Sequence, residues 1–214
     1  DDPMMYAQAV KSVSVPTQSI LFNIDIEGPL TKDKTAVLRV FAKMFYNHCG
    51  FYGDDLKIAK LERFIEKQGK TQQFREAFEK VNGAPWTETR DSFAFFEDDI
   101  VSVLQSTLGM SEQAARNWFN GEETNELSIA QLVADIQEYV DGKGKDFRLL
   151  FMVDEVGQYI GDDGDLMINL QSLVEEIGIR CHGKVWVMVT SQEAIDSVVH
   201  ITGNDFSKIQ GRFN

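Results

Sequence analysis

Two adjacent carboxylates, Asp154 and Glu155, directly follow five consecutive apolar residues, Leu149 to Val153. An apolar run without polar alternation predicts a strand buried on both faces, as in the middle of a parallel sheet covered by helices. Open α/β sheets bind ligands at the carboxyl ends of their strands. We therefore expect both carboxylates to lie at a ligand-binding edge. The alternative is a buried strand that ends in two solvated acids.

A strand that ends in Asp-Glu has the form of a Walker B element. In P-loop ATPases the Asp of such a pair helps to hold Mg²⁺ on the nucleotide phosphates, and in the AAA+ branch the Glu positions the attacking water. Asp154 is therefore a candidate for binding Mg²⁺ through the nucleotide, and Glu155 is a candidate catalytic residue. The corresponding cofactors are ATP and Mg²⁺.

A second polar turn, Thr190, Ser191 and Gln192, follows a second apolar strand. At this place, one helix after the Asp-Glu strand, AAA+ ATPases keep a sensor-1 residue that contacts the γ-phosphate or orients water. Any of the three residues could serve, whereas the alternative is that Thr190 only caps the next helix. Arg212 comes after that helix, where AAA+ oligomers often have an arginine finger that reaches the neighbouring subunit's nucleotide.

The phosphate-binding loop that should accompany these residues is missing from the sequence. The pattern Gly-x-x-x-x-Gly-Lys-Ser/Thr wraps phosphates with backbone amides. Gly69, Lys70 and Thr71 match its last three positions, but Phe64 stands where the first glycine is required. The tripeptide also joins two expected helices, so we interpret it as a helix break. Nucleotide binding by this chain alone is therefore not expected.

A metal-dependent nuclease is the competing enzyme class. Asp25 and Glu27, at the end of an expected strand, resemble the Asp-x-Glu motif of RNase H-like and proofreading exonucleases. Asp154 could complete a two-metal cluster with them. This hypothesis requires the three carboxylates to converge, whereas the ATPase hypothesis needs only Asp154 and Glu155 at the phosphate-binding edge.

The hydrophobic periodicity predicts the order strand, helix, helical insertion, strand, helix, strand, helix. The fold class is α/β, a partial P-loop (AAA+-like) parallel sheet with flanking helices and a large all-helical insertion. The first strand is expected over 19–26, after a frayed or loosely docked lead-in. We assign 1–50 and 146–214 to the α/β core and 51–145 to an acidic helical insertion.

The expected strand order places Val185 to Val189 at an edge of the sheet. The strand is apolar on both faces and has no proline or inward charge, and such an edge recruits another chain. We therefore expect either self-association through this strand or a cover formed by Met4 to Val15.

Composition limits the partners of the chain, which has 214 residues and a formal net charge of −13. This charge argues against gripping a phosphate backbone over a broad face. Residues 93–141 carry ten acidic residues and one basic residue, which indicates either a solvated helix surface or a docking face for a basic partner.

No membrane span or signal peptide is recognisable, and two cysteines make a disulfide framework improbable, so a cytoplasmic location is expected.

Four stretches are similar to the BrxC family of P-loop ATPases from bacterial BREX phage-resistance systems, which is related to PglY: 147–161, 170–178, 186–193 and 203–213. The resemblance extends back through 20–26 and covers most of the chain. It implies an internal fragment whose Walker A loop lies before Asp1.

The same resemblance implies the roles of individual residues. Asp154 takes the magnesium role, Glu155 positions water, the turn from Thr190 to Gln192 is sensor 1, and Arg212 is an arginine finger. It also implies other BREX components as partners, a homo-oligomer, and contact with DNA only indirectly or through other regions. The remaining alternative is a non-catalytic protein-interaction module in which the acidic insertion is the functional surface.

Overall fold

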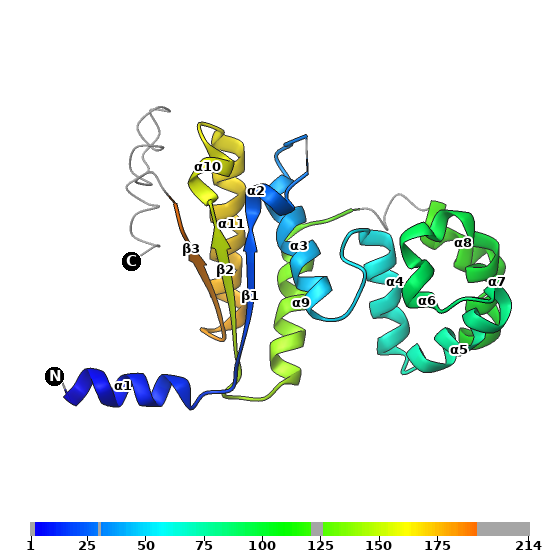
Figure 1. Ribbon diagram of the computed structural model, residues 1–214, viewed down its shortest axis with the longest axis horizontal. Helices are drawn as coiled ribbons and strands as arrows, with labels where there is room; N and C mark the ends of the chain where they lie inside the picture. The colour runs from blue at the N-terminus through cyan, green and yellow to red at the C-terminus, as the bar shows by residue number, and fades with distance from the viewer. Residues whose placement is uncertain (1–2, 30, 121–125, 192–214) are drawn as a thin grey trace. The chain divides into compact units, whose positions relative to one another are not determined.

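The computed structural model describes residues 3–29, 31–120 and 126–191 (Figure 1). The chain divides into two compact units. The sheet unit comprises Asp1–Phe41 and Leu127–Asn214, and the helical unit comprises Ala42–Glu126. No helix among the described residues is long and apolar enough to cross a membrane.

Three parallel strands form the sheet: β1 (Thr17–Asn23), β2 (Arg148–Asp154) and β3 (Val185–Val189). Their spatial order is β1-β2-β3, so the mixed α/β fold with three parallel strands is confirmed. Asn23 is the register partner of Asp154. The carboxyl ends of all three strands therefore meet at one edge.

The first strand ends earlier than expected. The side-chain oxygen of Asn23 accepts hydrogen bonds from the amides of Asp25 (3.0 Å) and Ile26 (3.2 Å). This cap starts a single helical turn, α2 (Ile24–Glu27), in place of the last residues of the predicted strand. Asp25 and Glu27 consequently lie on a helical turn and not on a strand.

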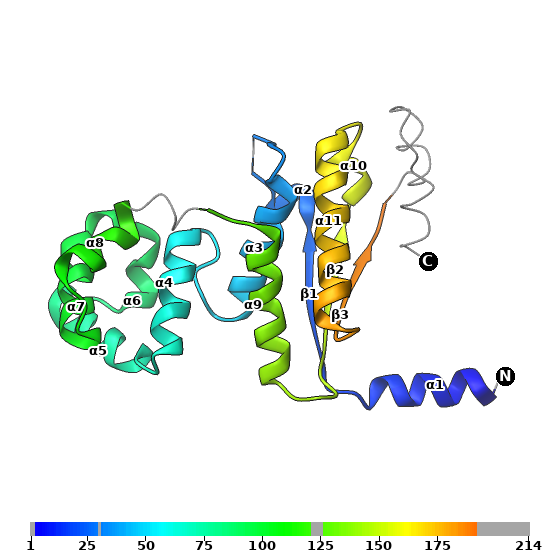
Figure 2. The same cartoon turned by 180° about the vertical axis from the view of Figure 1, so that it is seen from behind.

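Helices cover one face of the sheet, which we call the inner face. In Figures 1 and 2, α11 (Gly164–Cys181) lies along this face, and it packs against α9 (Ile129–Gly142). α3 (Ala36–His48) contributes Phe41, whose ring lies 5.5 Å from that of Phe22 and 5.3 Å from that of Phe151. The aromatic cluster joins α3 to β1 and β2 at the centre of the sheet unit.

The opposite face of the sheet, the outer face, is not covered in the same way. Leu149, Phe151 and Val153 are at most 1% exposed, whereas their neighbours Leu150 and Met152 are only partly buried. Burial therefore alternates along β2, and the predicted burial on both faces is wrong. The reason is that the long helices that the structure describes in the sheet unit after β1, α3, α9 and α11, pack on the inner face.

The lead-in before β1, which was expected to be frayed or loosely docked, forms a regular helix, α1 (Pro3–Val13). It does not pair with the edge strand, so the expected cover of β3 by Met4 to Val15 is wrong. Among the described residues β3 pairs with β2 alone.

The helical unit has its own apolar core, built from α4 (Leu56–Lys67), α5 (Thr71–Asn82), α6 (Trp86–Thr89), the 3₁₀ helix η1 (Arg90–Phe95), α7 (Glu97–Leu108) and α8 (Glu112–Asn120). The predicted helix break at Gly69 is confirmed, because this glycine has a φ of +65° between α4 and α5. The unit begins at Ala42 and ends at Glu126, whereas the sequence placed the insertion at 51–145. The difference at the C-terminal end arises because α9 packs on α11 and so belongs to the sheet unit, whereas the N-terminal bound falls within α3.

Cys181, in the last turn of α11, should make stability fall in alkaline solution. It is 2% exposed, and burial, with a smaller effect of Asp141, raises its pKa from 9.0 to about 11. Above pH 9 the thiol ionises in the unfolded chain but stays protonated in the folded one. The free energy of unfolding should therefore fall between pH 9 and pH 11, and less so in Cys181→Ala; urea unfolding at several pH values measures this. Equal losses in both proteins would contradict it.

Candidate functional site

The carboxyl edge of the sheet brings together the polar residues that follow β2 and β3. The Thr190 hydroxyl donates a hydrogen bond to Oδ1 of Asp154. Two main-chain hydrogen bonds hold the backbones of these residues together. The Thr190 amide donates to the carbonyl of Val153 (2.9 Å), and the Val156 amide donates to the carbonyl of Thr190 (3.1 Å). An exposed carboxylate and a hydroxyl thus share one corner of the edge.

Glu155 has an unusual backbone conformation at this corner. Its φ of 63° and ψ of 28° lie in the left-handed region, which costs a non-glycine residue roughly 1–3 kcal/mol. The residue begins α10 (Val156–Ile160), and its amide donates to Oδ1 of Asp154 (3.1 Å). The left-handed turn redirects the chain sharply out of β2, so the two carboxylates are adjacent in sequence but face different surroundings. Asp154 is exposed, whereas Glu155 is half-buried.

Gly157 allows the turn after β3 to pack against α10. A Cβ at Gly157 would lie 2.0 Å from Oγ of Ser191. A side chain at Gly157 would require the Ser191 side chain to move. The absence of a side chain here therefore allows Ser191 to pack against α10, and nothing in the sequence pattern indicated this role.

Two predicted site residues, Gln192 and Arg212, lie outside the described residues. The helix that Thr190 was alternatively expected to cap also begins there. Of the predicted nucleotide-site residues, the structure therefore brings together Asp154, Glu155, Thr190 and Ser191.

The three carboxylates of the nuclease hypothesis do not form a metal site. Among the described residues, no three His, Cys, Asp or Glu side chains lie close enough to hold one metal ion. Asp25 instead lies 3.8 Å from Nζ of Lys32. The cap on Asn23, which turns Asp25 and Glu27 onto α2, accounts for the difference from the sequence-based expectation.

Lys32 is a cation near α2 and α10 that no sequence motif indicated. Its Nζ donates to the carbonyl of Tyr159 (2.8 Å) and lies 4.0 Å from the centre of the Tyr159 ring. The Tyr159 hydroxyl is buried and has no hydrogen-bond partner among the described residues. Burial, followed by the charges of Asp25 and Asp33, raises the pKa of Tyr159. Only the fold brings these residues together, since Lys32 lies in a loop without a recognisable motif.

The edge fits part of a magnesium-nucleotide site. A carboxylate and a hydroxyl are hard oxygen donors of the kind that Mg²⁺ prefers. The phosphates would also need a loop of backbone amides or a lysine directed at them. The glycine-rich pattern for such a loop is absent from residues 1–214.

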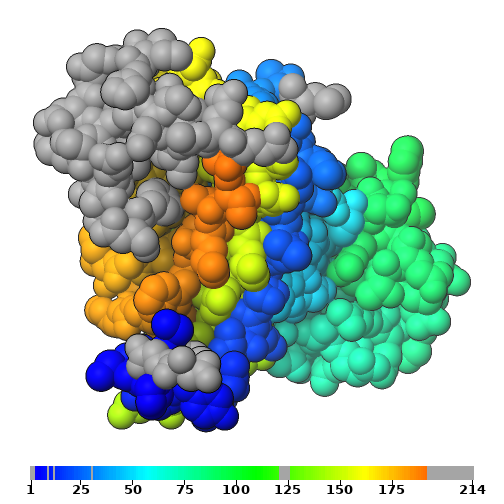
Figure 3. Space-filling view, turned by 60° about the vertical axis from the view of Figure 1, so that its left-hand side comes forward, coloured from blue at the N-terminus to red at the C-terminus, as the bar shows by residue number. Residues whose placement is uncertain are grey.

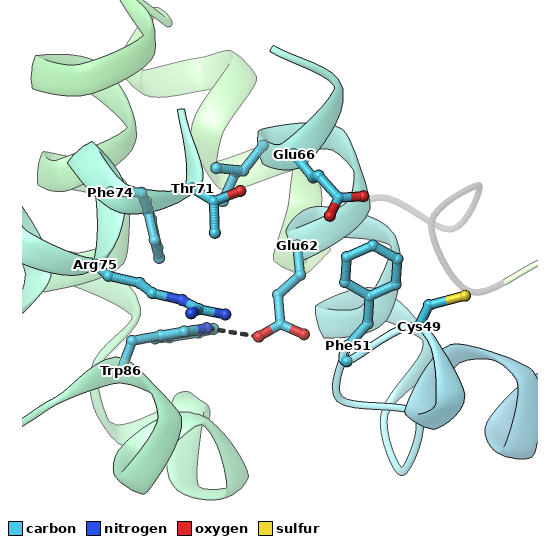
Figure 4. A pocket seen from close by; sticks show the side chains of 10 residues that line it. Cys49, Phe51, Glu62, Glu66, Thr71, Phe74, Arg75 and Trp86 are labelled. Carbon is cyan, nitrogen blue, oxygen red and sulfur yellow. Dashed lines mark hydrogen bonds between the residues drawn. The ribbon is translucent and has the colours of Figure 1, made fainter. Parts of the chain in front are cut away.

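A cavity of about 120 Å³ lies within the helical unit (Figure 4). Glu62 on its wall is 7% exposed. Its carboxylate accepts hydrogen bonds from Nε1 of Trp86 (2.7 Å), from Arg90 (2.9 Å) and from the amide of Tyr52 (2.5 Å). Because three groups donate hydrogen bonds to its carboxylate, Glu62 has a structural role and connects α4 to α6 and η1.

No protein-family model matches the chain. No solved structure matches it either.

Proposed function

We propose that this chain is part of an AAA+-type P-loop ATPase and supplies one side of its nucleotide site. The observation that carries the proposal is the hydrogen bond from Thr190 to Asp154 at the carboxyl edge of two parallel strands. The left-handed conformation of Glu155 beside it supports the same function, because strained backbone is concentrated at active sites.

Each residue has a separate task in this proposal. Asp154, oriented by Thr190, would hold a Mg²⁺ ion, which would neutralise phosphate charge, and Glu155 would orient and polarise the attacking water. One residue of the turn from Thr190 to Gln192 acts as sensor 1, and Arg212 acts on the nucleotide of a neighbouring subunit. The phosphate-binding loop is contributed by a segment of the intact protein before Asp1, with the pattern Gly-x-x-x-x-Gly-Lys-Ser/Thr.

We place this ATPase in a bacterial BREX phage-resistance system, on the resemblance of the four stretches to BrxC. Its partners are then other components of that system and further copies of itself, and its location is the cytoplasm. Contact with DNA is indirect or made by other regions, because a chain of net charge −13 repels a phosphate backbone.

A non-catalytic interaction module is the second candidate. The acidic helical unit favours it, because Arg116, the one basic residue of 93–141, is held by Glu97, Asp98 and Glu112 at 3.7, 2.9 and 2.9 Å. Asp98 and Glu112 stay 86% and 61% exposed despite these contacts, so this part of the segment presents negative charge to solvent or to a basic partner.

The chain of residues 1–214 alone should neither bind ATP at micromolar concentrations nor hydrolyse it, because it lacks the amides and the lysine that hold the phosphates. Isothermal titration calorimetry with Mg-ATP measures this directly. The intact protein, with the preceding segment, should bind ATP and lose that binding when its phosphate-loop lysine is replaced.

Micromolar ATP affinity in residues 1–214 would contradict the division of the site between two segments. An intact protein without a phosphate-binding loop would overturn the ATPase proposal itself and favour the interaction module.

A further inference from the structure

The outer face of the sheet is an apolar surface assembled from all three strands. The strand register aligns two rows across it, Ser19 with Leu150 and Trp186, and Leu21 with Met152 and Met188. Leu21, Trp186 and Met188 are 69%, 60% and 52% exposed. In Figure 3, β1, β2 and β3 lie side by side at the surface, coloured blue, yellow-green and orange. Parallel sheets are normally covered on both faces, whereas none of the helices that the structure describes lies over this face.

Helix α1 is a second exposed apolar surface. Tyr6, Val10 and Val13 recur at positions i, i+4 and i+7, which places them on one stripe of the helix. These side chains are 75%, 48% and 85% exposed. Lys11 is the only charged residue between Pro3 and Val13. An apolar helix with a single positive charge is complementary to an apolar face on an acidic molecule.

Exposed apolar area is concentrated on these two surfaces. Among the described residues, thirteen large hydrophobic side chains are exposed. Eight of them belong here: Met4, Met5, Tyr6, Val10 and Val13 on α1, and Leu21, Trp186 and Met188 on the sheet. At about 100 Å² each, they amount to on the order of 800 Å² per copy, about what each partner buries in a stable interface.

The dimensions of the two surfaces match. An eleven-residue helix is about 16 Å long and about 10 Å wide. Three strands about 4.8 Å apart span about 10 Å, and a strand of seven residues is about 23 Å long. One copy of α1 therefore covers most of one outer face.

The link between α1 and β1 holds the helix away from its own sheet. The Ser14 hydroxyl donates to the carbonyl of Lys11 (2.7 Å), and the Thr17 hydroxyl donates to the carbonyl of Val15 (2.8 Å). The carbonyl of Pro16 accepts from the amide of Arg148 (2.8 Å) and so fixes the link to the start of β2. Folding α1 back onto its own outer face would have to reorganise this three-residue link, whereas contact with another copy leaves it unchanged.

We propose that α1 of one copy packs on the outer sheet face of a second copy, in a reciprocal exchange that forms a two-fold symmetric dimer. Exchange of a terminal element through a short link is a common route to dimers. The outer face and α1 contain none of the residues assigned to the nucleotide site, so the exchange is tested separately from the ATPase proposal.

The oligomeric state of residues 1–214 tests the exchange. Light scattering coupled to gel filtration should give twice the mass of the chain. Tyr6→Asp and Val10→Asp should each weaken the dimer at least tenfold, since both place a charge on the apolar stripe of α1. Ile179→Asp is the matched control and should leave the dimer intact, because Ile179 is also exposed (67%) but lies on α11. A monomeric chain, or equal dissociation of the control, would overturn the proposal.

Cross-linking distinguishes exchange from folding back within one chain. In a Cys49→Ala background, the double variant Val10→Cys with Met188→Cys should form a disulfide between chains upon mild oxidation. Mass spectrometry of the non-reduced peptides should identify the bond between positions 10 and 188 in a product of twice the chain mass. The same bond within a single chain would overturn the exchange in favour of α1 covering its own sheet, and so would the absence of any such bond.

Discussion

If the chain belongs to an ATPase as proposed, replacing Glu155 with Gln in the intact protein is expected to leave ATP binding close to its original strength and to stop turnover. The amide keeps the shape and the half-buried volume of the carboxylate but cannot polarise water. General-base assistance of this kind contributes about 10²- to 10⁴-fold to a rate, and we expect a loss of that size in kcat. Phosphate release at saturating ATP measures turnover, and a fluorescent ATP analogue measures binding.

Two further variants separate the carboxylate from its backbone conformation. Glu155→Gly should relieve the left-handed strain at φ 63° and still lack turnover, because it also lacks the carboxylate. Asp162→Asn is the control for loss of one negative charge nearby and should keep turnover, because this exposed acid lies beyond α10. Unchanged hydrolysis in Glu155→Gln would remove Glu155 from the mechanism.

The proximity of Asp154 and Thr190 could be predicted from the sequence because it depends on only two features. Both residues follow apolar runs with a helical segment between them, and parallel strands joined through helices have their carboxyl ends at one edge. Once β2 and β3 are neighbours, their last residues lie close together whatever the rest of the chain does. The hydrogen bond between them then follows from a register in which Val153 is paired with Val189.

The one-sided burial of β2 could not be predicted in this way. Leu150 and Met152 are as apolar as the buried residues beside them. The apolar run from Leu149 to Val153 is therefore compatible with a sheet covered on one face or on both. Coverage depends on where the connecting helices pack, which is a property of the whole topology. The early end of β1 had a weak local signal, because an Asn before Ile-Asp-Ile-Glu is a good helix cap, but the alternating apolar residues favoured a strand.

Loss of Arg90 is expected to destabilise the helical unit more than loss of a surface arginine does. Arg90 donates a hydrogen bond to Oε1 of Glu62 (2.9 Å), and the side chain of Glu62 is only 7% exposed. Removing one partner of a buried ion pair leaves an uncompensated buried charge, which costs roughly 3–5 kcal/mol. Because Trp86 and the Tyr52 amide still donate to Glu62, we expect Arg90→Ala to lower the free energy of unfolding by about 3 kcal/mol.

Arg116→Ala is the matched control, since it is the same substitution in the same helical unit. Arg116 contacts three carboxylates, but its side chain is 37% exposed and that of Asp98 is 86% exposed. Exposed pairs contribute about 0–1 kcal/mol, so the control should cost less than about 1 kcal/mol although it removes more ion pairs.

Urea unfolding followed by tryptophan fluorescence should report both losses of stability, because Trp86 donates a hydrogen bond to Glu62. Equal losses in the two variants would mean that burial of Glu62 does not govern the stability of this unit. A larger loss in Arg90→Ala, reduced when Glu62→Gln is added, would assign the difference to the buried charge itself.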